Sequence, residues 1–161
     1  MKKLLVCAMG LWLFNAVVLG QAPRKVDEVE KYNCEGLMAR LDAFAVDIQY
    51  DRGKGFGYVV AYEGRYTRRL YNLKTGKSLG EKAFLPRFGE VNVRAEYIRD
   101  YLINRRGLEK RSLMLVNGGF REEHGVELWI VPRFGKLPKL SRTVAKIKYR
   151  RGIPKPYCEG L

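Results

Sequence analysis

The chain has 161 residues, 31 of them lysine or arginine and 17 aspartate or glutamate, for a formal net charge of +14. This length is typical of a single domain, and the absence of internal repeats and low-complexity tracts excludes a repeat array. A strongly basic surface favours acidic partners such as wall polymers, anionic lipid head groups or polyanionic glycans, and the other explanation is that the charge only maintains solubility.

The first 20 residues resemble an export signal. Lys2 and Lys3 precede an almost continuously apolar stretch, and Val18 and Gly20 are small enough for a signal peptidase site. We therefore predict a signal peptide at 1–20, cleaved after Gly20. An uncleaved anchor is the alternative, because the apolar stretch is at the short limit of a membrane span. In either case the folded part is expected to be periplasmic or secreted, with no later transmembrane segment.

The first half of the mature chain predicts an edge strand, a helix and a strand. Residues 26–29 form either a lead-in or a short edge strand. Apolar residues at helical spacing predict an amphipathic helix over 35–50, with Asn33 as its cap. Residues 58–62 are β-branched, aromatic and almost continuously apolar, which predicts a strand buried on both faces, as in a sheet covered by helices.

Residues 65–90 are treated as an insertion. Two extended segments flank Lys74–Lys77, which fits either a short hairpin or a mobile loop. A second amphipathic helix is predicted over 91–102, with Asn92 as a cap and Gly107 as the C-terminal stop.

The last part of the chain predicts two strands and a basic tail. The strands cover 112–116 and 126–131, and we expect Asn117, Gly118 and Gly119 and a charged turn to join them. Pro132 is expected to end the sheet, and residues 143–149 alternate enough for a late edge strand.

The resulting fold class is α+β, with two helices packed on one face of a small mixed sheet. The predicted order is helix, strand, helix, strand, strand, in a domain at 21–132 with the insertion at 65–90 and a basic C-terminal tail at 133–161. The insertion carries a net charge of +5 and the tail +8, whereas the rest of the mature chain sums to −1.

Several short motifs follow the same order as those of a known family. They are Glu63-Gly64-Arg65-Tyr66-Thr67, Arg94-Ala95, Tyr101-Leu102, Gly107-Leu108, Gly118-Gly119 and Val126-Glu127. Over about half of the mature chain this pattern resembles the OmpA-like periplasmic domain, the peptidoglycan-anchoring module of bacterial envelopes. The Asn33-Cys34-Glu35 start and the 126–132 strand are also similar to a group of small secreted bacterial proteins of unknown role.

The resemblance implies a ligand site and shows where this chain departs from it. Arg94 matches the family's binding arginine, a residue suited to bidentate contact with a carboxylate. Thr67 stands where the family has its ligand-binding aspartate, and His124-Gly125 replaces a pair of arginines. The predicted ligand-binding residues are Arg94, Arg65, Thr67, Arg68 and Arg69, together with the tail residues Lys146, Lys148, Arg150 and Arg151.

Aromatic residues are interleaved with these arginines. Tyr62, Tyr66, Tyr71 and Phe84 either form a sugar- or polyanion-contacting surface or pack the insertion onto the domain. The sequence leaves both readings open.

Cys34 and Cys158 are the two cysteines of the mature chain, and in an oxidising compartment we expect them to form one disulfide. Two separate thiols are the alternative. With no C-x-x-C pair, neither a redox motif nor a zinc knuckle is expected, and no metal or cofactor is predicted. His124 is the single histidine and is interpreted as a charged turn residue, since no nucleophile or second metal ligand accompanies it.

Residues 54–60 match the start of the RNA-binding RNP1 pattern, but Ala61 occupies the final aromatic position, so nucleic-acid binding is the least favoured function. The leading hypothesis is an exported, non-enzymatic envelope protein that contacts peptidoglycan or another acidic wall polymer through a basic surface. The alternative is a structural or interaction protein whose basic tail docks a protein partner or an anionic membrane.

Overall fold

A curled sheet with a projecting hairpin is the frame of the fold, which the computed structural model describes for residues 22–154. Its strands are β1 (Arg24–Glu30), β2 (Gly55–Tyr71), β3 (Ser78–Phe84), β4 (Leu113–Glu123) and β5 (Gly125–Pro132). The main sheet has β1, β5 and β2 in that order, with β4 on the other edge of β2. The β2–β4 pair is parallel and the other pairs are antiparallel.

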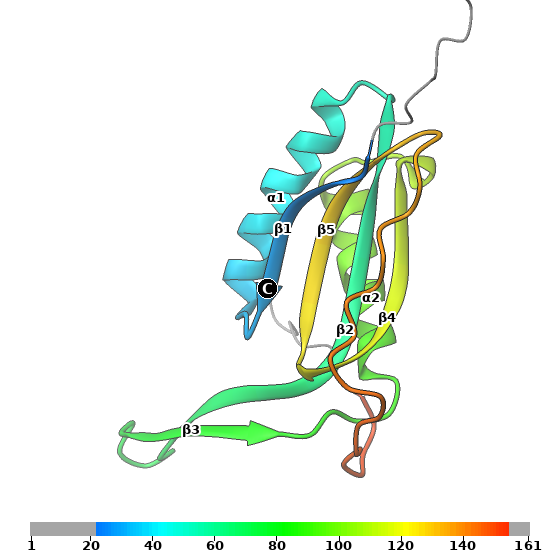
Figure 1. Ribbon diagram of the computed structural model, residues 1–161. Coiled ribbons are helices and arrows are strands. Elements are labelled where there is room, and N and C mark those ends of the chain that lie inside the picture. The colour runs from blue at the N-terminus through cyan, green and yellow to red at the C-terminus, as the bar shows by residue number, and fades with distance from the viewer. Residues whose placement is uncertain (1–21, 155–161) are drawn as a thin grey trace, which may run out of the picture.

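The second half of β2 leaves the main sheet. From Tyr66 to Tyr71 it pairs with β3, and the two strands project as a ribbon (Figure 1). We call residues 66–84 the arm. Of the two alternatives for this segment, the structure shows the hairpin, since the chain reverses over residues 72–77, where the Asn72 N–H donates to the Lys77 carbonyl at 2.8 Å.

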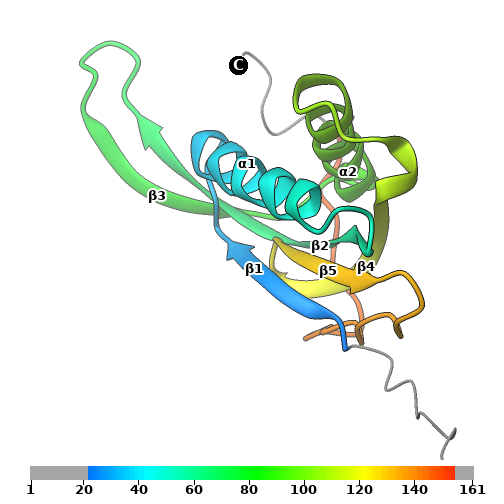
Figure 2. The same ribbon diagram turned by 90° about the horizontal axis from the view of Figure 1, so that it is seen from above.

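Both helices lie on one face of the sheet (Figure 2). Helix α1 (Cys34–Tyr50) is capped as predicted, because the Asn33 side chain accepts a hydrogen bond from the Gly36 N–H at 2.8 Å. Helix α2 (Glu90–Asp100) continues into a π-helical turn at Tyr101–Arg105, and a separate 3₁₀ turn follows at Lys110–Ser112. Within the described residues, no helix combines the length and apolar character needed to cross a membrane.

Of the two predicted ends of the second helix, the C-terminal stop is confirmed and the N-terminal cap is wrong. Gly107 has a φ of 70°, and its N–H donates to the Ile103 carbonyl, so it ends the helical segment as predicted. Asn92 is not the cap, because α2 begins at Glu90, before Asn92, and Gly89 occupies the cap position.

The sheet is buried on both faces, but by different covers. The helices pack on one face against Val59 and Leu128, with Phe44 and Ile98 among the core residues they contribute. A smaller cluster on the other face contains Tyr58, Val60, Tyr62 and Val131. Burial of 58–62 on both faces is thus confirmed, although only one face is covered by helices.

The chain after β5 supplies part of the second cover. In the described residues 133–154 it forms no regular strand, only the isolated bridges Phe120–Val144 and Arg87–Arg150. Figure 1 shows this segment crossing the sheet on the side away from the helices. The predicted strand at 143–149 was therefore wrong, because isolated backbone bonds and side-chain contacts, rather than a continuous ladder, hold this segment.

The glycines expected to join β4 and β5 lie inside β4. A Cβ at Gly118 would lie 2.3 Å from Tyr62 Cε1, and Gly119 has a φ of 90° where the β2–β4 register shifts. Gly118 allows the close packing against Tyr62, and Gly119 allows the bulge. The chain reverses at His124 instead.

Candidate functional site

Three of the predicted binding residues come together from distant parts of the chain. Arg65, near the middle of β2, and Lys146 and Lys148 of the tail line a cavity of about 250 Å³. We call it the basic cavity. Its full lining is Arg65, Leu85, Arg121, Glu122, Val144, Lys146, Ile147 and Lys148.

The charge in the basic cavity is mainly positive. Lys146 and Lys148 are exposed, and neither has an ion pair within residues 22–154. The Arg65 side chain is 48% exposed, and its guanidinium lies 3.9 Å from the Glu123 carboxylate, a distance at which an exposed pair contributes little. Three cations are therefore available to an incoming anion, against the exposed carboxylate of Glu122.

A buried charge network places the tail over the sheet. Arg121 is only 4% exposed in its side chain and lies 2.6 Å from both Glu127 Oε1 and Glu28 Oε1. Its guanidinium also covers the Tyr62 ring at 3.8 Å. Ser141 joins from the tail, with its N–H donating to the Tyr62 hydroxyl at 3.0 Å and its carbonyl accepting from Arg121 Nε at 3.0 Å.

Glu127 is the centre of this network and is fully buried. Burial raises the pKa of its carboxyl, but hydrogen bonds from Ser141, Lys25, Trp129 and Tyr62 outweigh that effect, so the pKa lies below its usual value. A charged residue in the middle of the apolar run of β5 was the one sequence signal that could have revealed a buried ion pair there.

The end of the described tail packs against the base of the arm. Tyr66 and Phe84 stack with ring centroids 5.5 Å apart, and the Arg150 guanidinium lies over both rings at 5.2 and 5.6 Å. Arg150 also donates to the Tyr66 hydroxyl. Of the open readings for the aromatics, Tyr66 and Phe84 therefore pack, as does Tyr62, whereas Tyr71 is 53% exposed.

Neighbouring Tyr149 adds a second contact between the tail and the sheet. Its hydroxyl donates to Glu63 Oε2 at 2.7 Å, and burial together with that carboxylate raises the pKa of Tyr149 to about 12. Arg150 is thus occupied by packing, while Arg151 remains exposed.

Arg94 and His124 lie in the interior, and neither lines the basic cavity. Arg94 is 3% exposed, and its guanidinium lies 5.9 Å from the Tyr32 ring centroid. His124 is fully buried, and its Nδ1 lies 3.1 Å from the Arg65 carbonyl. Burial, with a contribution from the Arg94 charge, lowers the pKa of His124 to about 3. His124 does lie at the turn between β4 and β5, but its interpretation as a charged residue was wrong, because the ring is buried and its pKa is lowered.

The other predicted binding residues lie on the arm. Thr67 is opposite Ala83, Arg68 is opposite Lys82, and Arg69 pairs with Glu81 at 3.2 Å. None of the three lines the basic cavity. The structure therefore distributes the predicted ligand residues over four places: the cavity, the interior, the arm and, for Arg150 and Arg151, the end of the described tail.

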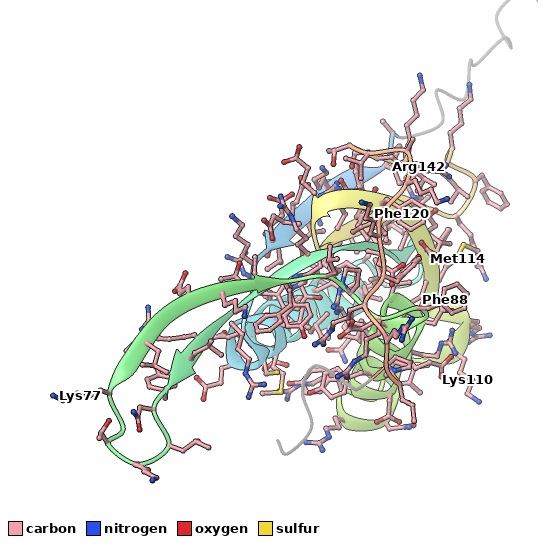
Figure 3. All side chains as sticks on the ribbon, turned by 90° about the horizontal axis from the view of Figure 1, so that it is seen from below. Lys77, Phe88, Lys110, Met114, Phe120 and Arg142 are labelled. Atoms are coloured by element: carbon pink, nitrogen blue, oxygen red, sulfur yellow. The ribbon has the colours of Figure 1, made fainter. Side chains whose placement is uncertain are left out.

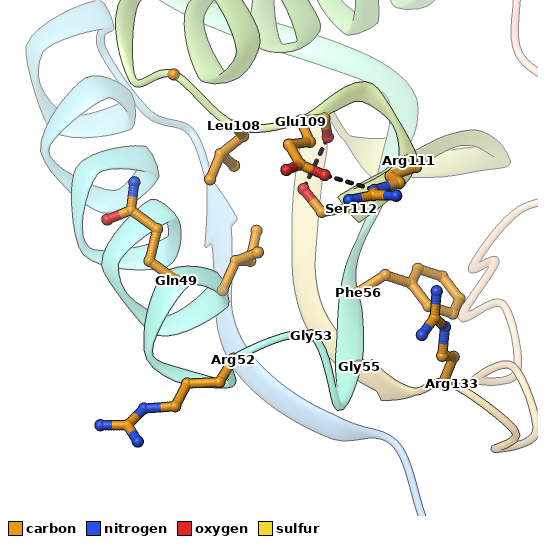
Figure 4. Close-up of a pocket in the computed structure, with 12 residues that line it drawn as sticks. Gln49, Arg52, Gly53, Gly55, Phe56, Leu108, Glu109, Arg111, Ser112 and Arg133 are labelled. Atoms are coloured by element: carbon orange, nitrogen blue, oxygen red, sulfur yellow. Dashed lines mark hydrogen bonds and ion pairs between the residues drawn. The ribbon is translucent and has the colours of Figure 1, made fainter.

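A larger hollow of about 680 Å³ lies at the N-terminal end of β2 (Figure 4). Arginines line it, but Nε of Arg111 is 2.5 Å from Glu109 Oε2, and Arg52 points away from the other side chains. Its charges therefore do not converge. The RNP1-like run starts β2 beside this hollow, and Tyr58 is only 4% exposed, so its ring is not open to a base.

The cysteine and signal predictions fall partly outside the described residues. Cys34 is the first residue of α1, whereas Cys158 and the signal at 1–20 lie beyond the described range, so the pairing and the cleavage remain predictions. Across residues 22–154 no three His, Cys, Asp or Glu side chains converge as metal ligands would.

Comparison of the chain with known protein families, curated proteins and solved structures found no match.

Proposed function

We propose that this is an exported, non-enzymatic binding protein that holds peptidoglycan or another acidic envelope polymer through the basic cavity. The convergence of Arg65, Lys146 and Lys148 around one hollow is the observation that carries the proposal. The order of helices and strands over residues 34–132, with β3 as an addition, is compatible with the resemblance to OmpA-like domains.

The cavity suits a small anionic group of a larger polymer. A volume of about 250 Å³ admits a carboxylate- or phosphate-bearing unit but not a whole chain. Arg65 supplies a planar guanidinium for bidentate contact, and the two lysines add mobile point charges. Leu85, Val144 and Ile147 provide an apolar wall that strengthens these charge interactions by limiting water.

The proposal differs from the binding mode implied by the family resemblance. Arg94 is 3% exposed, so its guanidinium does not face open solvent. Thr67 lacks a charge for the amine of diaminopimelate and lies on the arm opposite Ala83. We therefore expect weak or no selectivity for diaminopimelate-containing wall peptides, and binding governed by charge instead.

Sedimentation with purified wall sacculi tests the proposal. The triple variant Arg65→Gln, Lys146→Gln, Lys148→Gln should lose binding at low salt, and the wild type should weaken as salt is added because screening shortens the reach of its charges. A matched control, Arg133→Gln, Lys136→Gln, Lys139→Gln, removes the same charge from exposed tail residues outside the cavity. Equal loss in both triples, or salt-independent binding, would reject the cavity as the site.

The second candidate is an interaction protein whose basic tail docks a protein partner or an anionic membrane. Exposed apolar side chains among the tail cations favour it, notably Phe134 at 95%, Leu137 at 52% and Ile153 at 83%. Under this hypothesis Phe134→Ser with Ile153→Ser should abolish binding to the partner surface, while the cavity triple should leave it unchanged.

A further inference from the structure

The arm is the least covered part of the described chain. Its strands pair only with each other beyond Arg65, and every residue of β3 except Phe84 is exposed. Figure 2 shows the ribbon projecting away from both helices. At about 3.4 Å per residue it reaches roughly 20 Å from its base. A two-stranded ribbon with both faces in water contributes little to a core, so burial does not explain its length.

The tip of the arm is a defined structure. The Asn72 side chain accepts hydrogen bonds from the N–H groups of Lys74 and Thr75 at 2.9 and 3.1 Å, and Gly76 has a φ of 68°. This turn leaves Leu73 fully in solvent and Lys77 pointing away from the molecule (Figure 3). Leu79 and Tyr71 beside it are 64% and 53% exposed.

The charges on the arm do not balance. Besides Arg68 and Arg69 it carries Lys74, Lys77 and Lys82, and its single carboxylate, Glu81, is already paired with Arg69. Arg68 and Lys82 are direct cross-strand partners, and like charges placed opposite each other destabilise a ribbon. An anionic surface would relieve that repulsion.

The geometry points to the arm as a membrane-binding element that contacts an anionic lipid surface. The cations would meet head groups, and the exposed leucines at the tip would enter the boundary between head groups and acyl chains. A hydrated acidic polymer satisfies the cations equally well but offers nothing to Leu73 or Leu79. The apolar tip is therefore what favours lipid.

The base of the arm is built to carry such a contact. The Tyr66–Phe84 stack and the Arg150 guanidinium over it fix the ribbon to the domain. This lipid site is separate from the basic cavity, so one molecule has room to hold a wall polymer and a membrane at the same time.

Binding of the mature protein to vesicles tests this inference, with phosphatidylglycerol in phosphatidylcholine compared with phosphatidylcholine alone. At about 1 kcal/mol for each cation at the surface, Lys74→Gln with Lys77→Gln should weaken binding to the anionic vesicles about 30-fold. Lys136→Gln with Lys139→Gln removes the same charge elsewhere and should stay close to wild type. Leu73→Ser should weaken binding as well.

Insertion of the tip is measured directly with Leu73→Trp. Its emission should shift to the blue with the anionic vesicles only. An unchanged spectrum, or an equal effect of the two lysine pairs, would overturn the inference. The same variants are sedimented with sacculi. If the arm variants lose binding to sacculi but keep binding to vesicles, the arm binds the polymer and the lipid assignment is wrong. Retained sacculus binding leaves the proposed function intact whatever the vesicles show.

Discussion

Arg121→Met should be among the most costly single substitutions in the protein. The arginine side chain is 4% exposed, and its Nη2 lies 2.6 Å from the fully buried carboxylate of Glu127. Removing one partner of a buried pair costs about 3–5 kcal/mol, because the other charge stays buried. Lys25, Tyr62 and other donors still contact that carboxylate, which places the expected loss near the lower limit, about 3 kcal/mol. For a domain of this size that corresponds to roughly 10 °C in Tm.

Urea unfolding followed by circular dichroism measures this cost, and the double variant Arg121→Met, Glu127→Gln provides the comparison. The neutral amide still bonds to Tyr62 and Trp129, so the double variant should be more stable than Arg121→Met alone. The tail should also become sensitive to proteolysis near Ser141, because its carbonyl loses the Arg121 donor at 3.0 Å. A loss below about 1 kcal/mol, or a double variant no better than the single one, would refute the buried pair.

Three further predictions rest on other parts of the molecule. The pKa of His124 falls from 6.5 to about 3 on folding, so between these pH values the unfolded chain binds a proton that the folded chain does not. The free energy of unfolding should therefore fall by up to a few kcal/mol as the pH drops from about 6.5 to 3. His124→Gln should flatten that slope in an acid titration. Gly64→Ala should lower Tm markedly, because its Cβ would lie 2.2 Å from the backbone of Glu123, whereas Gly36→Ala would press only on the Asn33 side chain. Non-reducing mass spectrometry should find Cys34 and Cys158 joined, and alkylation of both without reductant would end that prediction.

The sequence predicted the elements whose signals are local. The apolar spacing of 35–50 and the short polar side chain of Asn33 determine where α1 begins, and both act within a few residues. Gly107 likewise needs only its own backbone freedom to end the second helical segment. The α+β class, with two helices on one face, follows from such signals.

The binding surface could not be predicted in the same way. Lys146 and Lys148 line the same cavity as Arg65 because the tail docks on other strands, with Ser141 bonded to Tyr62 and Glu127 and Val144 bridged to Phe120. No period in the tail indicates this contact, and the sequence pattern of 143–149 favours a strand that the structure lacks. The position of the tail is decided by buried polar groups far away in the chain.

The same network changes what the tail charge means. A net +8 over 133–161 looks like one mobile basic segment, but its cations have different fates. Arg142 donates to the Gly118 carbonyl at 3.2 Å, and Arg150 is packed over Tyr66, so both are engaged in holding the tail. Deleting the tail would remove those contacts and the Ser141 bonds along with the charge, so it cannot separate binding from folding. Neutral substitutions at Lys146 and Lys148 change only the charge that faces the cavity, and an effect on polymer binding alone would therefore locate the site there.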